Sequence, residues 1–309
     1  MGMTKLLHEV AEEKVAELGD RLVDRGITLP ERYRVLFLLR NAAGEAATRR
    51  LIEALECRDL GNLFRHDVAF CLGQRQDGTA IAALRAVVED TADHPMVRHE
   101  AGEALGAIAT PECLEVVERF TADPCPEMAE TCQLALARIA YRRRVEAGEA
   151  EELPDENPYL SVDPTPALPA STPMAELRAR LLDEGAPMFE RYRALFAVRN
   201  KGGAEAVQVL GEAFGAKSAL LKHEVAYVFG QLAHPASAAV LERVLRDEGE
   251  HAMVRHEAAE ALGAVATDKG AGVLRDLADD PEPIVAHSCI VALDELETHL
   301  AGGEYLAVA

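Results

Sequence analysis

Aromatic residues are scarce in this sequence of 309 residues: tryptophan is absent, and aromatic residues make up only 5% of the chain. Alanine, leucine, glutamate and arginine are abundant instead. This composition is typical of a mostly helical protein.

The sequence also lacks cysteine motifs and long apolar runs. Its six cysteines show no CxxC spacing, and most of them fall on apolar helical positions, which indicates a reduced compartment. The N-terminal segment has no apolar run of the signal-peptide type, and no segment reaches the apolar length of a membrane span. We therefore expect a cytosolic (cytoplasmic) protein with no membrane partner.

Basic residues are in deficit, with 32 lysines and arginines against 53 aspartates and glutamates, for a formal charge of −21. This balance argues against a nucleic-acid partner, because binding to the phosphate backbone needs clustered basic side chains. A cationic partner or substrate fits the charge better, although acidity can also serve solubility alone.

A long internal duplication is the dominant pattern in the chain. The segment Met96–Thr110 occurs again as Met253–Thr267 with only two differences, and each copy contains a His-Glu dipeptide. In each half, another His-carboxylate dipeptide stands 33 residues upstream. Four such dipeptides therefore occupy matched positions: His66-Asp67, His99-Glu100, His223-Glu224 and His256-Glu257.

Apolar periodicity with glycine and proline punctuation predicts eight helical hairpins, four in each half. In the first half we expect helices at residues 3–22, 31–41, 45–57, 62–74, 79–90, 96–109, 112–121 and 127–142. The second helices of the hairpins align in one register: Tyr33, His66, His99 and Glu130, then Tyr192, His223, His256 and His287.

The repeat length of 31 to 33 residues is compatible with several families of helical repeat. Ankyrin and tetratricopeptide motifs are missing, whereas Asp-Pro before a second helix and Ala-Leu inside it favour HEAT-type repeats. The second helix of such a hairpin lines the concave surface, so the aligned side chains are expected to face a common interior.

Six prolines lie between residues 148 and 173 and predict an extended connector. The expected fold is all-α, with HEAT-like hairpins in two pseudo-symmetric halves of four repeats each. We place the halves at residues 1–147 and 174–309.

The paired histidines and carboxylates suit a transition metal. Two histidines with one carboxylate leave positions open on iron for oxygen chemistry, whereas structural zinc would call for cysteine ligands. Neighbouring residues on a helix point about 100° apart, so both members of a dipeptide can approach one ion. Two matched halves then predict a dinuclear site between them. The alternative is a polar groove for a basic peptide, with the histidines as hydrogen-bonding partners.

The four dipeptides occur together with Arg-Tyr-Arg-Xaa-Leu-Phe at 32–37 and 191–196, and with Glu-Asn-Pro-Tyr-Leu-Ser-Val-Asp-Pro at 156–164. This combination resembles the deoxyhypusine hydroxylase family over about residues 21–296. The resemblance implies a HEAT-repeat di-iron monooxygenase that uses O2 and an external electron donor. Its expected substrate is the deoxyhypusine side chain of translation initiation factor five-A, which it converts to hypusine.

Carried over by position, the resemblance implies two sets of iron ligands: His66, His99 and Glu100, and His223, His256 and Glu257. Asp67 and Glu224 are then expected either to orient a ligand or to face the cationic substrate. Asp67 departs from the family pattern, which has glutamate there. Because aspartate is one methylene shorter, a direct contact made by glutamate would need a water molecule or be lost.

Two other functions stay open from the sequence. A related di-iron oxygenase acting on another amine or a small molecule would keep the six ligands and make use of Asp67. A non-catalytic HEAT-repeat interaction scaffold would need no metal. Replacing His99 and His256 by alanine separates the enzymes from the scaffold, because an enzyme loses iron and a scaffold keeps its partner.

Overall fold

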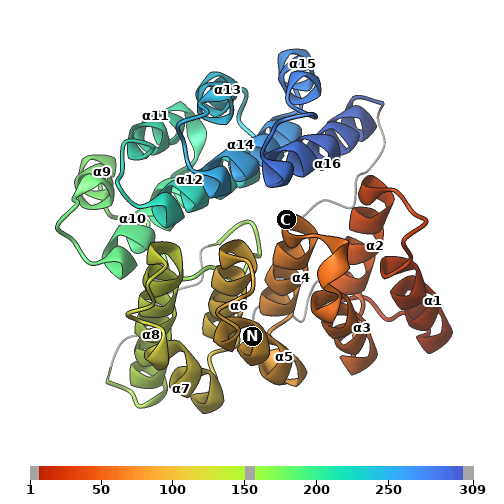
Figure 1. Cartoon of the computed structure of the whole chain (residues 1–309). Coiled ribbons are helices and arrows are strands. Elements are labelled where there is room, and N and C mark those ends of the chain that lie inside the picture. The colour runs from red at the N-terminus through yellow and green to blue at the C-terminus, as the bar shows by residue number, and fades with distance from the viewer. Residues whose placement is uncertain (1–6, 150–156, 302–309) are drawn as a thin grey trace. The chain divides into compact units, whose positions relative to one another are not determined.

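The computed structural model describes residues 7–149 and 157–301, and it consists of helices α1 to α16, short 3-10 turns and loops (Figure 1). No strand occurs among these residues, where β-type pairing is limited to one bridge between His8 and Ala42. Within these ranges, none of the helices combines the length and apolar character needed to span a membrane. The predicted all-α fold of helical hairpins is confirmed.

The chain divides into two compact units. The described part of the first unit is residues 7–149 and 160–164, and that of the second is 157–159 and 165–301. The first unit contains α1 (Glu12–Leu22), α2 (Leu29–Asn41), α3 (Glu45–Glu56), η2 (Arg58–Leu60), α4 (Asn62–Arg75), η3 (Gly78–Ala80), α5 (Ile81–Glu89), α6 (Pro95–Ile108), α7 (Pro111–Arg119) and α8 (Pro126–Glu146).

The second unit repeats this order of hairpins. It contains α9 (Met174–Leu182), α10 (Met188–Lys201), α11 (Gly203–Ala213), α12 (Ala219–Leu232), η4 (Pro235–Ser237), α13 (Ala238–Arg246), α14 (Ala252–Val265), α15 (Asp268–Asp276) and α16 (Pro283–Leu300). Within each unit the second helices of neighbouring hairpins pack side by side (Figure 1). We call these the inner helices: α2, α4, α6 and α8, and α10, α12, α14 and α16.

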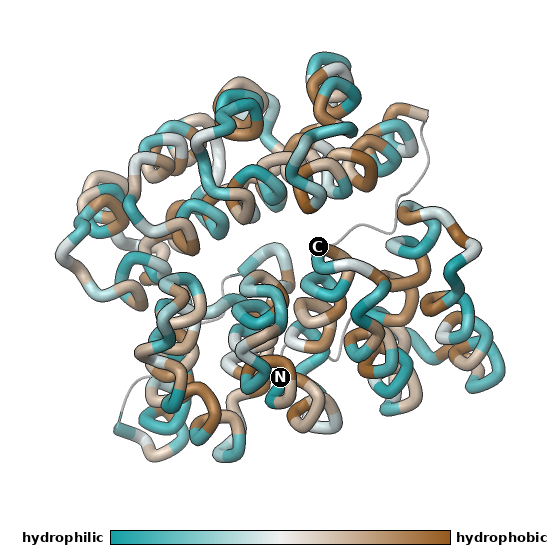
Figure 2. The backbone as a smooth tube through the Cα atoms, viewed as in Figure 1, coloured by the Kyte–Doolittle hydropathy of each residue, from teal (hydrophilic) through white to brown (hydrophobic). Residues whose placement is uncertain are grey.

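The central inner helices are buried on nearly all sides, as α4 and α6 show, where only two residues of each helix are not buried. Hydrophobic and hydrophilic residues are mixed along the helices of both units (Figure 2). Fully buried leucine, valine and phenylalanine side chains form the core between the hairpins, among them Leu36, Val68 and Phe229.

The register of the inner helices agrees with the sequence to the residue. Each aligned residue is the fifth residue of its helix: Tyr33, His66, His99, Glu130, Tyr192, His223, His256 and His287. Local signals set these starting points. α2 begins with a capping box between Thr28 and Glu31, and α6 begins with a proline at its first position.

The first predicted helix, residues 3–22, is wrong in its N-terminal part. α1 begins only at Glu12, and residues 3–6 lie outside the described residues. The N–H of His8 donates to the carbonyl of Asn41 at 2.7 Å, and its carbonyl accepts from the N–H of Ala43 at 2.8 Å. Since the backbone of His8 pairs with the segment after α2, residues 7–11 do not form a helix.

Neighbouring inner helices approach closely where glycine faces alanine. A Cβ atom on Gly106 would lie 2.7 Å from Cβ of Ala135, and one on Gly263 would lie 2.9 Å from Cβ of Ala292. Two further pairs repeat the contact: Gly73 with Ala104, and Gly230 with Ala261. Because no side chain separates the backbones there, residues on adjacent inner helices can share one ligand.

An arginine one residue before the aligned position ties neighbouring hairpins together. In α6, Nε of Arg98 donates to the carbonyl of Val88 at 3.2 Å, and its NH2 group donates to Asp123 at 2.7 Å. Arg255 in α14 repeats both contacts, with Asp280 as the acid at 2.5 Å. The same type of backbone contact is made by Arg32, Arg65 and Arg191. The carbonyls belong to the last turns of outer helices, where helical partners are missing.

The described part of the proline-rich segment contains no helix, as predicted. Within the first unit, Nε2 of Gln74 donates to the carbonyl of Val162 at 3.2 Å, and the N–H of Val162 donates to Oε1 of Gln74 at 2.8 Å. Within the second unit, the guanidinium of Arg199 lies 5.1 Å from the ring centroid of Tyr159. The connector is therefore fastened by specific contacts rather than by its prolines alone.

Candidate metal centre

The first unit brings together His66 from α4 and His99 and Glu100 from α6. Their ligand atoms all lie within 4.8 Å of one another, and Nε2 of His66 is 3.3 Å from Oε2 of Glu100. The three residues are 3%, 0% and 4% exposed. A buried set of two imidazoles and one carboxylate can hold a transition metal.

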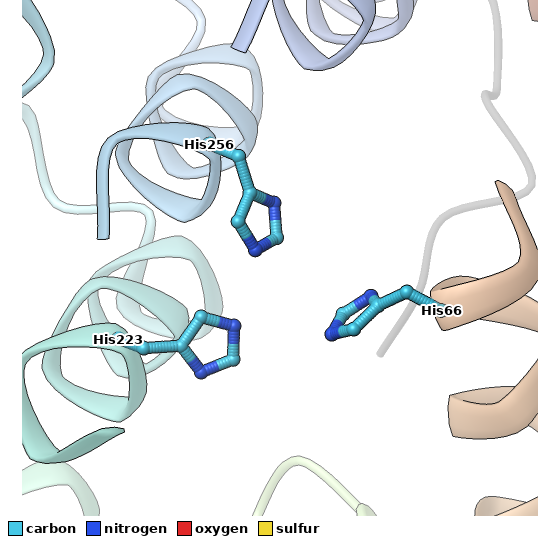
Figure 3. A group of neighbouring side chains, drawn as sticks. All are labelled: His66, His223 and His256. Carbon is cyan, nitrogen blue, oxygen red and sulfur yellow. The ribbon is translucent and has the colours of Figure 1, made fainter. Parts of the chain in front are cut away.

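The second unit repeats this arrangement with His223 from α12 and His256 and Glu257 from α14. The rings of His223 and His256 lie side by side, with centroids 5.2 Å apart (Figure 3). Oε2 of Glu257 is 3.3 Å from Nε2 of His223 and 4.0 Å from Nε2 of His256. In the first unit the centroids of His66 and His99 are 5.3 Å apart, so the ring spacing is conserved between the units.

Asp67 contacts the Nδ1 side of the His66 imidazole. Nδ1 of His66 is 2.7 Å from Oδ1 of Asp67, and the hydroxyl of Tyr33 donates to Oδ2 of Asp67. All three side chains are buried. Glu224, the matched carboxylate of the second unit, is also buried on α12 beside His223.

Glu260 and Ser288 are additions that sequence reasoning missed. Oε1 of Glu260 lies 3.3 Å from Nδ1 of His256, and it accepts a hydrogen bond from Oγ of Ser288 at 3.0 Å. The ligand atoms of His256, Glu257 and Glu260 also lie within 4.8 Å of one another. The available signal was a carboxylate four residues after the histidine, on the same helix face.

In the first unit, buried carboxylates near the imidazole shift the pKa values of their neighbours. Burial lowers the pKa of His66, but hydrogen bonds to Asp67 and Glu100 outweigh it and hold that pKa well above its usual range. Burial and the carboxylate of Glu100 raise the pKa of Glu103 to about 8. A divalent ion would relieve this excess of buried negative charge.

The remaining aligned and loop histidines have other surroundings. His287 shares the register but is exposed on α16. Nδ1 atoms of His94, His234 and His251 accept backbone N–H groups at the starts of α6, η4 and α14. These three side chains cap helices.

The two buried sets fit a divalent iron ion by the chemistry of their donors. Imidazole nitrogen and carboxylate oxygen are typical ligands of non-haem iron, and three protein ligands leave coordination positions open. None of the six cysteines belongs to a group of three or more residues in the described chain that could hold a metal.

Comparisons with known proteins agree with this architecture. A family profile of HEAT repeats matches residues 48–137 and 207–294. The chain is 49% identical to deoxyhypusine hydroxylase-B of Oryza sativa subsp. japonica over 288 residues, which is 92% of this chain and 93% of the rice protein. It is 48% identical to deoxyhypusine hydroxylase of Homo sapiens over 289 residues, 93% of each protein.

A solved structure is similar over the same range. The structure of human deoxyhypusine hydroxylase in complex with glycerol matches with a TM-score of 0.86 and 47% sequence identity. The match covers 93% of this chain and 96% of the human chain.

Proposed function

Because this chain belongs to the deoxyhypusine hydroxylase family, we propose that it is a monooxygenase that hydroxylates a deoxyhypusine side chain. The observation that supports this most directly is the buried His-His-carboxylate set found in each unit. A HEAT-repeat scaffold without chemistry has no need of two such sets.

Each unit would hold one iron ion, so the protein would carry two. The ligands would be His66, His99 and Glu100 in the first unit, and His223, His256 and Glu257 in the second. Bound iron supplies the activation of O2 for attack on an unactivated C–H bond. One oxygen atom enters that bond, and the other leaves as water with two electrons and two protons from an external donor.

The protein's own residues have three tasks in this reaction. The Gly–Ala contacts and the arginine ties hold neighbouring inner helices in fixed register, which keeps the ligand donors in place. Burial of the donors excludes bulk water. Glu224, a buried carboxylate beside His223, is the candidate to pair with a cationic amine of the substrate.

The protein partner we propose is translation initiation factor five-A carrying deoxyhypusine. The formal charge of −21 would attract a basic segment around the modified lysine. This effect raises the rate of encounter more than it fixes specificity.

A related oxygenase acting on another amine is a second candidate, favoured by one observation. Asp67 stands where the family pattern has glutamate, and it is bonded to His66 and Tyr33. In a related oxygenase, the shorter carboxylate would change the space beside His66 and, with it, the amine that is accepted.

The decisive experiment combines metal analysis with product analysis. We expect about two ferrous ions per chain, a visible charge-transfer band after exposure to air, and conversion of deoxyhypusine to hypusine on the translation factor. His99→Ala and His256→Ala should each lose one iron and the activity, whereas the cap variant His234→Ala should keep both. Wild-type protein that stays metal-free after anaerobic loading with ferrous iron would overturn the proposal. Iron binding without hypusine formation would favour the other amine.

A further inference from the structure

A hydrogen-bonded chain runs outward from the imidazole of His66. Nδ1 of His66 contacts Oδ1 of Asp67 at 2.7 Å, and Oδ2 of the same carboxylate accepts the hydroxyl of Tyr33. Since an ionised carboxylate only accepts hydrogen bonds, Nδ1 of His66 carries the proton. The nitrogen left to hold an ion is then Nε2, which lies 3.3 Å from Oε2 of Glu100 and would give up its proton when a metal binds.

The second unit contains a chain of the same kind, built from other positions. Nδ1 of His256 contacts Oε1 of Glu260 at 3.3 Å, and that oxygen accepts Oγ of Ser288 at 3.0 Å. The nitrogen of His256 left to hold an ion is again Nε2, which lies 4.0 Å from Oε2 of Glu257. Oε1 of Glu260 thus contacts both Ser288 and the imidazole, which places this oxygen on the Nδ1 side of His256, away from Nε2.

The two chains start from different histidines of the repeat. In the first unit the oriented histidine, His66, lies on α4, the second of the four inner helices. In the second unit the oriented histidine, His256, lies on α14, the third of the four. At the positions matched to the two hydroxyl donors, Tyr192 donates to the carbonyl of Leu220 at 3.2 Å, and the Thr131 hydroxyl has no hydrogen-bond partner among the described residues.

We propose that the Tyr33–Asp67 pair and the Ser288–Glu260 pair are positioning residues, each of which fixes one ligand histidine with Nε2 toward the metal. This inference rests on the proposed function. Asp67 then orients His66 and does not contact the substrate. Of the matched carboxylates Asp67 and Glu224, only Glu224 is left to face the substrate amine.

The chemistry of metal-bound histidine supports this assignment. A carboxylate that accepts the second N–H of a ligand imidazole fixes its tautomer and ring orientation and raises its basicity, and its loss typically weakens metal binding about 10- to 100-fold. Both oxygens of Asp67 are used within this chain. A side chain held in this way is poorly suited to receive a mobile substrate amine.

The test measures ferrous-iron affinity by chelator competition under anaerobic conditions, without substrate. Tyr33→Phe and Ser288→Ala should each weaken one of the two iron sites about 10-fold or more and leave the other unchanged. Tyr192→Phe and Thr131→Val remove the matched hydroxyls and should leave both sites unchanged. Ser288→Thr should keep normal binding, because threonine retains the hydroxyl that donates to Glu260.

Asp67→Ala separates the two roles of Asp67. Loss of the carboxylate leaves Nδ1 of His66 without its acceptor and should weaken one iron site, whereas loss of a residue that only faces the substrate would change only the KM for the translation factor. Normal iron affinity in Tyr33→Phe, Ser288→Ala and Asp67→Ala, each checked for folding by circular dichroism, would overturn this inference alone. Failure of the wild-type chain to bind iron would instead overturn the proposed function.

Discussion

At the scale of single residues, the arginine before His66, His99 and His256 depends on a buried acid. The side chains of Arg255 and Asp280 are 5% and 3% exposed. Burial raises the pKa of Asp280, but the guanidinium of Arg255 and the N–H of Glu282 outweigh it and hold that pKa below its usual range. The ionised acid therefore stabilises the fold beside His256.

Asp280→Asn should lower the free energy of unfolding by about 3 kcal/mol at neutral pH, because it leaves a buried guanidinium without its counter-charge. Since the folded pKa lies below the unfolded one, the stabilisation is complete above about pH 4 and is lost as the pH falls through the folded pKa. The difference between variant and wild type in urea unfolding should therefore shrink at low pH. Asp279→Asn, at an exposed neighbour, should change little, and a difference that persists unchanged at low pH would contradict the electrostatic account.

At the scale of helices, the glycines at the contacts between inner helices set the distance between ligand-bearing segments. A Cβ atom on Gly106 would lie 2.7 Å from Cβ of Ala135 and 3.1 Å from its Cα atom. These are backbone-borne atoms, which cannot swing aside. α6 carries His99 and Glu100, so displacement of this helix also moves two ligands.

Gly106→Ala should therefore destabilise the protein by about 1–3 kcal/mol through overpacking, and it should weaken iron binding in the first unit. Gly272→Ala is the matched control on the outer helix α15, where an added Cβ meets nothing within 4 Å. That control should be neutral or stabilising by roughly 0.5–1 kcal/mol, because alanine favours the helix. Thermal and urea unfolding of both variants measure the contrast, and equal effects would refute close packing as the cause.

At the scale of the whole molecule, bound metal is expected to contribute to stability. Two ligand sets each join neighbouring inner helices, α4 with α6 and α12 with α14. A ligand that binds only the folded chain raises the free energy of unfolding by about 3–4 kcal/mol at 100 to 1,000 times its dissociation constant. The net charge of −21 adds to this effect, because divalent cations reduce self-repulsion.

Removal of iron by chelation should lower the melting temperature of the wild-type chain by on the order of 5 °C, measured by calorimetry with and without ferrous iron. The double variant His99→Ala and His256→Ala should melt at the same temperature under both conditions. A wild-type melting temperature that is the same with and without iron would show that the two sets do not hold metal tightly.

The repeat architecture and the matched positions of the His-carboxylate dipeptides could be predicted because they follow from local periodicity. Duplication of Met96–Thr110 as Met253–Thr267 and helical spacing of apolar residues determined the hairpins, their register and the matched positions of His66, His99, His223 and His256. The extent of the first helix was wrong, because residues near His8 bond to a segment more than thirty positions away. Helical periodicity carries no information about such pairing.

Only the tertiary structure decided which residues stand behind the ligands. Tyr33 and Asp67 are 34 residues apart, and Glu260 and Ser288 are 28 apart, so each pair meets only when neighbouring inner helices pack. The two halves therefore match in their His-carboxylate dipeptides but differ in the carboxylate that contacts the imidazole, Asp67 for His66 and Glu260 for His256. The sequence determined where the ligands lie along each helix, whereas packing between hairpins determined which nitrogen of His66 and of His256 is left to bind a metal.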